Sequence, residues 1–552
     1  MKNKYKYLFL GVIIIAVVLR FWQLGNVPAS PDWDEVSLGY NAYSLIQTGK
    51  DEYGKAFPLI LRSFDDYKPA LYAYLIIPFI SIFGLNTFAV RFPGALFGVI
   101  AVIATYFLVK ELFRQDKYKD HISLLSAFLL AISPWHLQFS RIAFEAQVGL
   151  SLNLLSLLFF LKGLRRNVFF VLSAIFAAAS VYIYQSEKVY LPILFFFLVL
   201  IYGKELLRVS KIWLGVSIIT GALICLPMVY GLFTDSNSLL RAKGVSVFSD
   251  QTQFLKNNSL KYADDKNNND YLGLVLDNRR LEYAKAIVSG YISHYNFNWL
   301  FITADIERHH APFMGLMYLF ELPFLLIGIY ILIFWPFSLK SKLTVLIIFL
   351  IAPIPASVTS GVPHAVRTIN FLPIFQIFVA LGIFYSWDYV SKNKRRLLNI
   401  PIEYFLLLIF ILVFSFNFIY YLNQYFVQQN KYFSESWQYG YKEAVEYMSP
   451  IEDRYSKIIV SSEAPLDQSY MFFLFYTKFD PVLYQESGGT ISGGFAEEHK
   501  GYGKFSFRHI DWQNEEKGTL LIGRPGDFPA GAKILKKINY LNGKPAIIII
   551  EK

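Results

Sequence analysis

The sequence predicts a polytopic α-helical membrane protein that ends in a small α/β domain. Of its 552 residues, 55% are hydrophobic and only 17% are charged, whereas soluble globular chains carry about 25% charged residues. The 52 phenylalanines and 38 tyrosines suit a bilayer core with aromatic residues at its edges. The third observation is a series of apolar runs close to the length of about 20 residues that spans a bilayer.

Eleven apolar segments are candidate transmembrane helices. They are residues 5–24, 87–110, 121–136, 148–164, 167–184, 189–203, 211–231, 313–336, 343–358, 368–387 and 400–422. The first begins like a signal peptide, but its apolar part is longer and no small-residue cleavage pattern follows, so we expect a retained helix. The apolar stretch from Pro69 to Gly84 is expected to lie in or dip into the outer leaflet, with Pro69 in its first turn.

The distribution of lysine and arginine orients the chain. With eleven spans, every basic cluster falls on one side, which the positive-inside rule assigns to the cytoplasm. The clusters are Lys2, Lys4 and Lys6, then residues 110–119, 162–166, 204–211, 340–342 and 392–396. Counting Pro69–Gly84 as a twelfth span would distribute these basic clusters over both sides of the membrane. We therefore expect a cytoplasmic amino terminus and an extracytoplasmic carboxyl-terminal domain. Membrane orientation explains the net charge of +11, and no nucleic-acid partner is expected.

This topology predicts a transmembrane domain over residues 1–422 and an extracytoplasmic α/β domain over residues 423–552. Two outer loops are long, residues 25–88 and 232–312. In the last domain we expect strands at 457–462, 519–523 and 546–551 and a helix at 466–477. That domain has no convincing nucleophile–base pair or phosphate-binding loop, so we expect it to cover the outer face or help receive an acceptor. The one cysteine, Cys225, excludes an intrachain disulfide and a cysteine-based metal site.

Charged residues gather in the predicted outer loops near span ends. The groups are Asp32-Trp33-Asp34-Glu35, Asp65-Asp66-Tyr67-Lys68-Pro69, Arg141 with Glu145, and His364 with Arg367. Arg141 and Glu145 are four residues apart and would share one face of a helix. Asp32 and Asp34 would share a face of an extended chain, which leaves metal binding open. The adjacent pair His309-His310 is less suited to a metal, because neighbouring histidines point apart.

These groups suit sugar transfer from a lipid phosphate. The attacking hydroxyl needs a carboxylate to accept its proton, and the phosphate leaving group needs cations as charge develops on it. Asp34 or Glu35 can serve as the base. Lys68, Arg141 and Arg367 can bind the phosphate. Simpler roles stay open: a polar loop for the acids, an i,i+4 ion pair for Arg141 with Glu145, and an interfacial lysine for Lys68.

Six stretches of the chain, in this order and spacing, resemble one known family. They are PDWDEVSLGYNAYSLIQTGKDEYG, DDYKPALYAYL, FGLNTFAVRFPGALFG, SPWHLQFSRIAFE, PHAVRTINFLP and WQYGYKEAVEYM. The resemblance is to the GT-C membrane glycosyltransferases, in the branch of the protein O-mannosyltransferases, the ArnT-type aminoarabinose transferases and the bacterial RgtA–D-like enzymes. It runs from Arg20 to about Met448 and implies the GT-C fold, with juxtamembrane helices in the first outer loop.

The resemblance also implies roles for individual residues. It implies that Asp34 is the catalytic acid, with Glu35 completing the Asp-Glu pair, and that Lys68 contacts the donor phosphate. Glu145 matches an acid of the second outer loop, with Arg141 before it. In ArnT-type enzymes a glutamate implicated in metal binding precedes the lysine. Here that place is Tyr67, and Asp66 lies one residue earlier. A divalent metal is left open, with Asp32, Asp66, Glu145 and His364 as candidates for binding it or supporting the acceptor.

The expected function is the inverting transfer of a hexosyl or pentosyl unit from a polyprenyl-phosphate donor, with Asp34 as the base. The acceptor would be a protein, a glycan or a lipid at the outer face of a bacterial plasma membrane. An O-antigen ligase or polymerase would instead depend on arginines and histidines of the long outer loop. A transporter or flippase would show inverted repeats and charges near the middle of spans, for which only Glu321 qualifies. A catalytically inactive protein would act through its outer domain.

Overall fold

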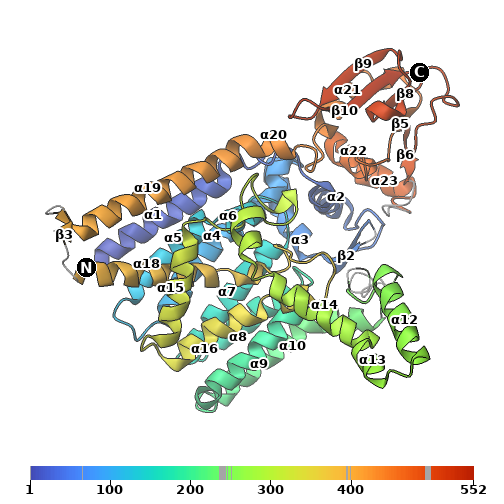
Figure 1. Ribbon diagram of the computed structural model, residues 1–552. Coiled ribbons are helices and arrows are strands. Elements are labelled where there is room, and N and C mark those ends of the chain that lie inside the picture. The colour runs from blue at the N-terminus through green and yellow to red at the C-terminus, as the bar shows by residue number, and fades with distance from the viewer. Residues whose placement is uncertain are drawn as a thin grey trace.

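The structure is a computed structural model and describes residues 2–64, 66–234, 244, 246–249, 252–392, 396–397, 400–491 and 499–552. Asp65, Lys394 and Arg395, on which sequence predictions rest in part, lie outside these residues. Figure 1 shows a helical bundle with a separate sheet domain at one end. The amino terminus and β3 (Arg396–Leu397), in the connection between the last two long helices, lie at the opposite end. The predicted topology puts these two ends on opposite sides of the membrane, and the side on which each lies stays a prediction.

The bundle follows the predicted apolar segments. Its helices are α1 (Lys2–Phe21), α4 (Thr87–Leu112), α5 (Lys119–Ile132), α6 (Pro134–Ser140), α7 (Ala146–Gly163), α8 (Phe169–Val181), α9 (Glu187–Leu206), α10 (Lys211–Thr234), α15 (Glu321–Phe334), α16 (Leu339–Ile351), α17 (Ile354–Ser357), α18 (Ile374–Lys392) and α19 (Ile402–Asn423). Within the described ranges, seven helical segments are long and apolar enough to cross a membrane, or eight if the bent pair α5 and α6 forms one span. Helices α8 and α15 have only 13 and 14 residues, so the count of eleven spans stays a prediction.

The first outer loop contains α2 (Trp33–Thr48), a hairpin of β1 (Ile60–Ser63) and β2 (Asp66–Pro69), and α3 (Leu71–Phe83). Helix α3 is 13 residues long and apolar, which agrees with a helix that does not cross the bilayer. It does not begin at Pro69 as predicted. Lys68 precedes a proline, and a residue in that place favours an extended backbone. The chain therefore stays extended through Lys68, and Pro69 pairs with Ile60 in the hairpin.

The long outer loop carries helices of its own. These are α12 (Thr252–Asn267), α13 (Tyr271–Leu276) and α14 (Arg279–Ser293), followed by the π-helical turn η2 (Trp299–Thr303) and the 3-10 turn η3 (Glu307–His309). Helices α12 and α13 lie at the edge of the molecule in Figure 1. Beyond them the chain returns to the bundle, where Trp299, Leu300 and Phe301 are buried. The return places residues 304–312 against the first outer loop.

The carboxyl-terminal domain is built on a six-stranded mixed sheet in the order β6-β7-β5-β8-β10-β9. Its strands are β5 (Ile458–Val460), β6 (His499–Tyr502), β7 (Phe505–Phe507), β8 (Leu520–Gly523), β9 (Ile534–Asn539) and β10 (Pro545–Glu551), with helices α21 (Tyr441–Met448), α22 (Ser469–Thr477) and α23 (Pro481–Glu486). The three predicted strands and the predicted helix coincide with β5, β8, β10 and α22. The chain stays helical beyond the predicted boundary at 423, through η5 (Gln424–Gln428) and α20 (Gln429–Phe433).

The sheet domain packs onto the first outer loop. Gly39 of α2 lies against the ring of Phe475 in α22, so closely that a Cβ atom there would clash. The buried carboxylate of Glu52 accepts hydrogen bonds from Asn41, from Tyr470 at 3.3 Å and from Thr490 at 2.7 Å. Glu52 thus accepts hydrogen bonds from the first outer loop and from the sheet domain, and these bonds hold the two parts of the molecule together.

Candidate active site

The acidic segment at 32–35 forms the amino-terminal cap of α2. Asp32 is the N-cap residue, and its Oδ1 accepts a hydrogen bond from the Glu35 backbone at 3.0 Å. The Glu35 carboxylate in turn accepts a hydrogen bond from the Asp32 backbone N–H at 3.2 Å, which completes a capping box. Because the segment enters a helix, Asp32 and Asp34 do not share a face as an extended chain would allow. The cap fixes Asp32 and Glu35 and leaves Asp34 pointing elsewhere.

Glu35 belongs to a buried ion pair. Arg91 of α4 donates to both of its carboxylate oxygens, each at 2.8 Å, and the Ala143 backbone donates to Oε1 at 2.8 Å. Neither side chain is exposed. Arg91 also donates to the carbonyls of Pro28 and Ser30 at 2.9 Å. The expectation of a catalytic Glu35 meets a physical obstacle, because both of its carboxylate oxygens already accept hydrogen bonds from Arg91 and backbone N–H groups.

Asp34 faces a cavity of about 160 Å³ and forms an ion pair there with Lys68. The Asp34 side chain is 30% exposed. Lys68 projects from β2, which is held in place where Gln185 donates to the Tyr67 carbonyl at 2.8 Å. The charged and histidine side chains that line this cavity are Asp34, Lys68, Glu145, Arg308, His309 and His364.

Glu145 and Arg141 are separated by the fold. Arg141 ends α6 and Glu145 precedes α7, so the residues between them are not helical and the two side chains do not share a face. Arg141 is buried and donates to the carbonyls of Leu19 at 2.8 Å, Arg20 at 3.0 Å and Val27 at 3.2 Å. The prediction that Arg141 faces the cavity is therefore wrong. Glu145 does line it, and its Oε1 has no hydrogen-bond partner among the described residues.

Arg308 is a cavity residue that sequence reasoning missed. Its guanidinium lies 2.6 Å from Asp32 Oδ2 and covers the ring of Trp33 at 4.5 Å. Its backbone carbonyl accepts from Gln138 of α6 at 2.6 Å. The only sequence signal was a basic residue at the end of the long outer loop. Its place in the cavity depends on how that loop returns to the bundle.

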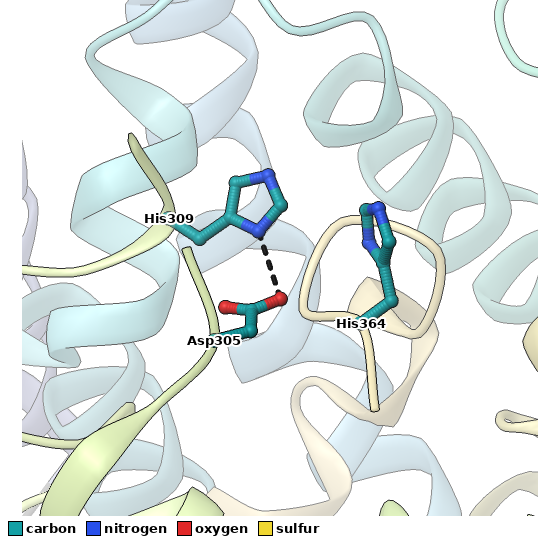
Figure 2. A group of neighbouring side chains, drawn as sticks. All are labelled: Asp305, His309 and His364. Carbon is teal, nitrogen blue, oxygen red and sulfur yellow. Dashed lines mark hydrogen bonds and ion pairs between the residues drawn. The ribbon is translucent and has the colours of Figure 1, made fainter. Parts of the chain in front are cut away.

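The remaining predicted residues lie around the cavity. Arg367 donates to Thr359 Oγ1 at 2.6 Å and to the Ser360 carbonyl at 2.7 Å, and its neighbour Val366 lines the cavity. Asp66 lies in β2 outside the lining. His364 lines the cavity beside His309 and Asp305, and these three are the one group within the described residues whose ligand atoms are close enough to hold a metal ion (Figure 2).

His309 and His310 point apart, as adjacent histidines were expected to do. His309 Nδ1 lies 2.8 Å from Asp305 Oδ2, whereas His310 Nδ1 donates to the Ala311 carbonyl at 2.7 Å. The potential metal ligands thus come from an i,i+4 pair and a distant loop, and the adjacent pair contributes only one of them.

Burial and charge shift the pKa values in the cavity. Burial raises the pKa of Glu145 to about 7, although the charge of Lys68 opposes the shift. Burial raises the pKa of Asp32 to about 6 against the opposing charge of Arg308. Burial acts to lower the pKa of Lys68, but Asp34 and Glu145 outweigh it and raise that pKa above its ordinary value. Lys68 is therefore a cation at neutral pH, while Glu145 is partly protonated.

Known proteins share this architecture. The sequence model of the dolichyl-phosphate-mannose-protein mannosyltransferase family matches residues 67–230, which include Lys68 and Glu145. No curated protein matches the chain by sequence. The structure resembles ArnT from Cupriavidus metallidurans bound to undecaprenyl phosphate, with a TM-score of 0.54, 11% identity, and coverage of 100% of this chain and 98% of that one. The chain therefore shares the fold of ArnT, and less than a third of its sequence matches the mannosyltransferase family model.

A second similar structure is the oligosaccharyltransferase AglB from Archaeoglobus fulgidus, in complex with an inhibitory peptide and a dolichol-phosphate. It matches with a TM-score of 0.52, 14% identity and coverage of 86% of this chain. The chain spans 64% of the length of AglB. At these identities the two likenesses establish the fold.

Proposed function

We propose that this protein transfers a sugar from a polyprenyl-phosphate donor to an acceptor hydroxyl at the outer face of the membrane. The observation that carries the proposal is the cavity in which Asp34 meets Lys68, with Arg308 and Glu145 in the same wall. One partly exposed carboxylate and two cations are the groups that a single displacement at a sugar phosphate needs.

The two solved neighbours support the choice of donor. One is bound to undecaprenyl phosphate and the other to a dolichol-phosphate, so each holds a polyprenyl phosphate on the same fold. The matching family model is named for a dolichyl-phosphate-mannose donor. For this chain the class of donor follows by analogy, while the sugar is left to experiment.

In the proposed reaction, an acceptor O–H gives its proton to a carboxylate oxygen of Asp34. The acceptor oxygen then forms a new bond to the anomeric carbon, and the bond from the anomeric carbon to the phosphate oxygen breaks. The electron pair of the broken bond stays on the phosphate, which leaves as polyprenyl phosphate. One displacement inverts the anomeric carbon and needs no covalent intermediate.

Each charged residue of the cavity has its own role in the proposed reaction. An entering phosphate gives Lys68 a second anion to pair with, which frees Asp34 to accept a proton. Arg308 supplies the second cation and stays oriented through Asp32. Glu145, with its pKa near 7, can donate a hydrogen bond to a phosphate oxygen without adding a negative charge. We assign no direct contact with the donor to Glu35 or Arg141.

The proposed topology puts the amino terminus in the cytoplasm and the sheet domain outside, in a bacterial plasma membrane. The basic clusters of the sequence support it, since all of them fall on one side of the predicted eleven-span topology, the side that the positive-inside rule assigns to the cytoplasm. The sheet domain borders the first outer loop through Glu52 and Gly39, which suits a role in receiving a protein, glycan or lipid acceptor.

The test is a transfer assay with the full-length protein in nanodiscs. A panel of synthetic polyprenyl-phosphate sugars is supplied, and release of polyprenyl phosphate and glycosylation of a cell-surface acceptor extract are measured. We expect wild-type protein to act on one donor. We expect Asp34→Asn to lower the rate by about 10²–10⁴-fold while inserting normally.

Asp453→Asn is the matched control, because the Asp453 side chain is almost fully exposed in the sheet domain. Wild-type-like transfer by folded Asp34→Asn would contradict the proposal. So would turnover of polyprenyl-diphosphate donors alone, which would indicate a ligase or polymerase.

A further inference from the structure

Asp305, His309 and His364 converge at one wall of the active-site cavity, although they come from two separate segments. Asp305 lies between η2 and η3, His309 is the last residue of η3, and His364 lies in the loop between α17 and α18. One ligand atom from each lies within 4.8 Å of the other two. Figure 2 shows His309 directly above the Asp305 carboxylate and the His364 ring across from both.

The Asp305 carboxylate is buried, but only one of its two oxygens has hydrogen-bond partners among the described residues. Its Oδ2 lies 2.8 Å from His309 Nδ1 and accepts from the Ala365 backbone at 2.8 Å. Its Oδ1 is buried and has no hydrogen-bond partner in the part of the chain that the structure describes. The side chain is only 10% exposed. A buried carboxylate oxygen without a donor is costly, and a bound cation would satisfy it.

The Ala365 contact joins the two segments. It fixes the Asp305 carboxylate from the backbone of the residue that follows His364. The His364 backbone donates in turn to His294 Nε2 at 3.1 Å. Metal ligands are usually oriented by second partners, and the Ala365 N–H is such a partner for the Asp305 carboxylate.

The ligand set selects the metal. Two imidazoles and one carboxylate are a typical set for Zn²⁺, whereas Mg²⁺ and Ca²⁺ prefer six or more oxygen ligands. Bonds of about 2.0–2.1 Å in a tetrahedron put the ligand atoms about 3.4 Å apart. Zinc binding would therefore draw the segments 305–309 and 364–365 slightly together.

We infer that Asp305, His309 and His364 bind Zn²⁺ and leave one coordination position open toward the cavity. The position of the histidines supports this, because both line the cavity that holds Asp34 and Lys68. The open position takes an oxygen of the donor phosphate, and this role of the metal rests on the proposed function. The ligand set differs from the one the family resemblance implied, since Tyr67 replaces the glutamate there.

The binding test uses full-length protein purified without a histidine tag and stripped of metal with a chelator. Zn²⁺ is then titrated against a chelating dye. We expect one tight site in wild-type protein. His364→Ala and Asp305→Asn should each weaken it by more than ~100-fold, because loss of an outer partner alone weakens a zinc site by about 10–100-fold.

His310→Ala is the matched control, since His310 is the chain neighbour of His309 and bonds elsewhere. Absence of tight Zn²⁺ binding to wild-type protein would overturn the inference, as would equal losses in His310→Ala and His364→Ala. X-ray absorption of zinc-loaded wild-type protein gives a second readout that needs no variant. Two histidine ligands with oxygen support the site, and a sulfur ligand overturns it.

Activity separates the metal from the proposed function. If zinc binds as expected and no donor is turned over, the proposed function fails and the metal site stands. If donor turnover and donor affinity are unchanged after zinc removal, the phosphate contact is overturned while the proposed function stands. A weaker affinity for the donor in metal-free protein supports the phosphate contact.

Discussion

Asp34 and Glu35 are neighbours in the chain, yet they belong to two regions with opposite electrostatic construction. In the cavity, Asp34 is 30% exposed beside Lys68, and an oxygen of Glu145 has no partner among the described residues. At the next residue, both carboxylate oxygens of Glu35 accept hydrogen bonds from Arg91 and from backbone N–H groups. Satisfied charges hold segments in place, whereas partly satisfied charges are available to a substrate.

The comparison is tested first by removing the buried pair. Breaking a buried ion pair from one side costs about 3–5 kcal/mol, because the other charge stays buried without its partner. We expect Arg91→Met and Glu35→Gln each to lower the thermal unfolding temperature and the monodisperse yield in detergent. The double variant should recover part of the loss. If Glu35→Gln unfolds like wild-type protein but loses transfer, Glu35 belongs to the cavity and the comparison fails.

The second prediction contrasts two cations, Lys68 and Arg141. We expect Lys68→Met to reduce kcat/KM by about 10²–10³-fold with little change in unfolding temperature, because it removes a cation from the developing phosphate charge. Arg141→Met should do the reverse. It loses hydrogen bonds to the carbonyls of Leu19, Arg20 and Val27, so stability falls while transfer per folded molecule persists. Equal losses of transfer in the two folded variants would remove the distinction.

The smallest expected effect concerns Glu52, a buried charge between the two parts of the molecule. Burial raises its pKa from 4.5 to about 7, against hydrogen bonds from Asn41 and Thr490. Between these values the folded state binds more protons than the unfolded state, so stability falls as pH rises through this window. We expect the unfolding temperature of wild-type protein to rise between pH 8 and pH 5, on a scale of ~2–4 °C per kcal/mol.

Glu52→Gln should flatten this dependence, because its side chain carries no titrating proton. Glu486→Gln, on the exposed face of α23, is the control. Identical pH profiles for wild-type protein and Glu52→Gln would contradict the assignment.

The sequence predicted the features that local pattern controls. Apolar length identified the segments that form the bundle, and charged residues at their ends identified Asp34, Lys68 and Glu145. The role of Arg141 could not be predicted, because it depends on the 58° bend between α5 and α6, which turns Arg141 toward the end of α1. The places of Arg308 and Asp305 could not be predicted either, since the long outer loop sets them through tertiary contacts.

The capping box around Asp34 also limits how this segment can evolve. Asp32 and Glu35 close a ring of fixed size, and each residue of an α-helix advances by about 100°. An inserted or deleted residue between them would break the cap and rotate Asp34 out of the cavity in the same step. The segment can accept a changed side chain at Trp33 far more easily than a changed length.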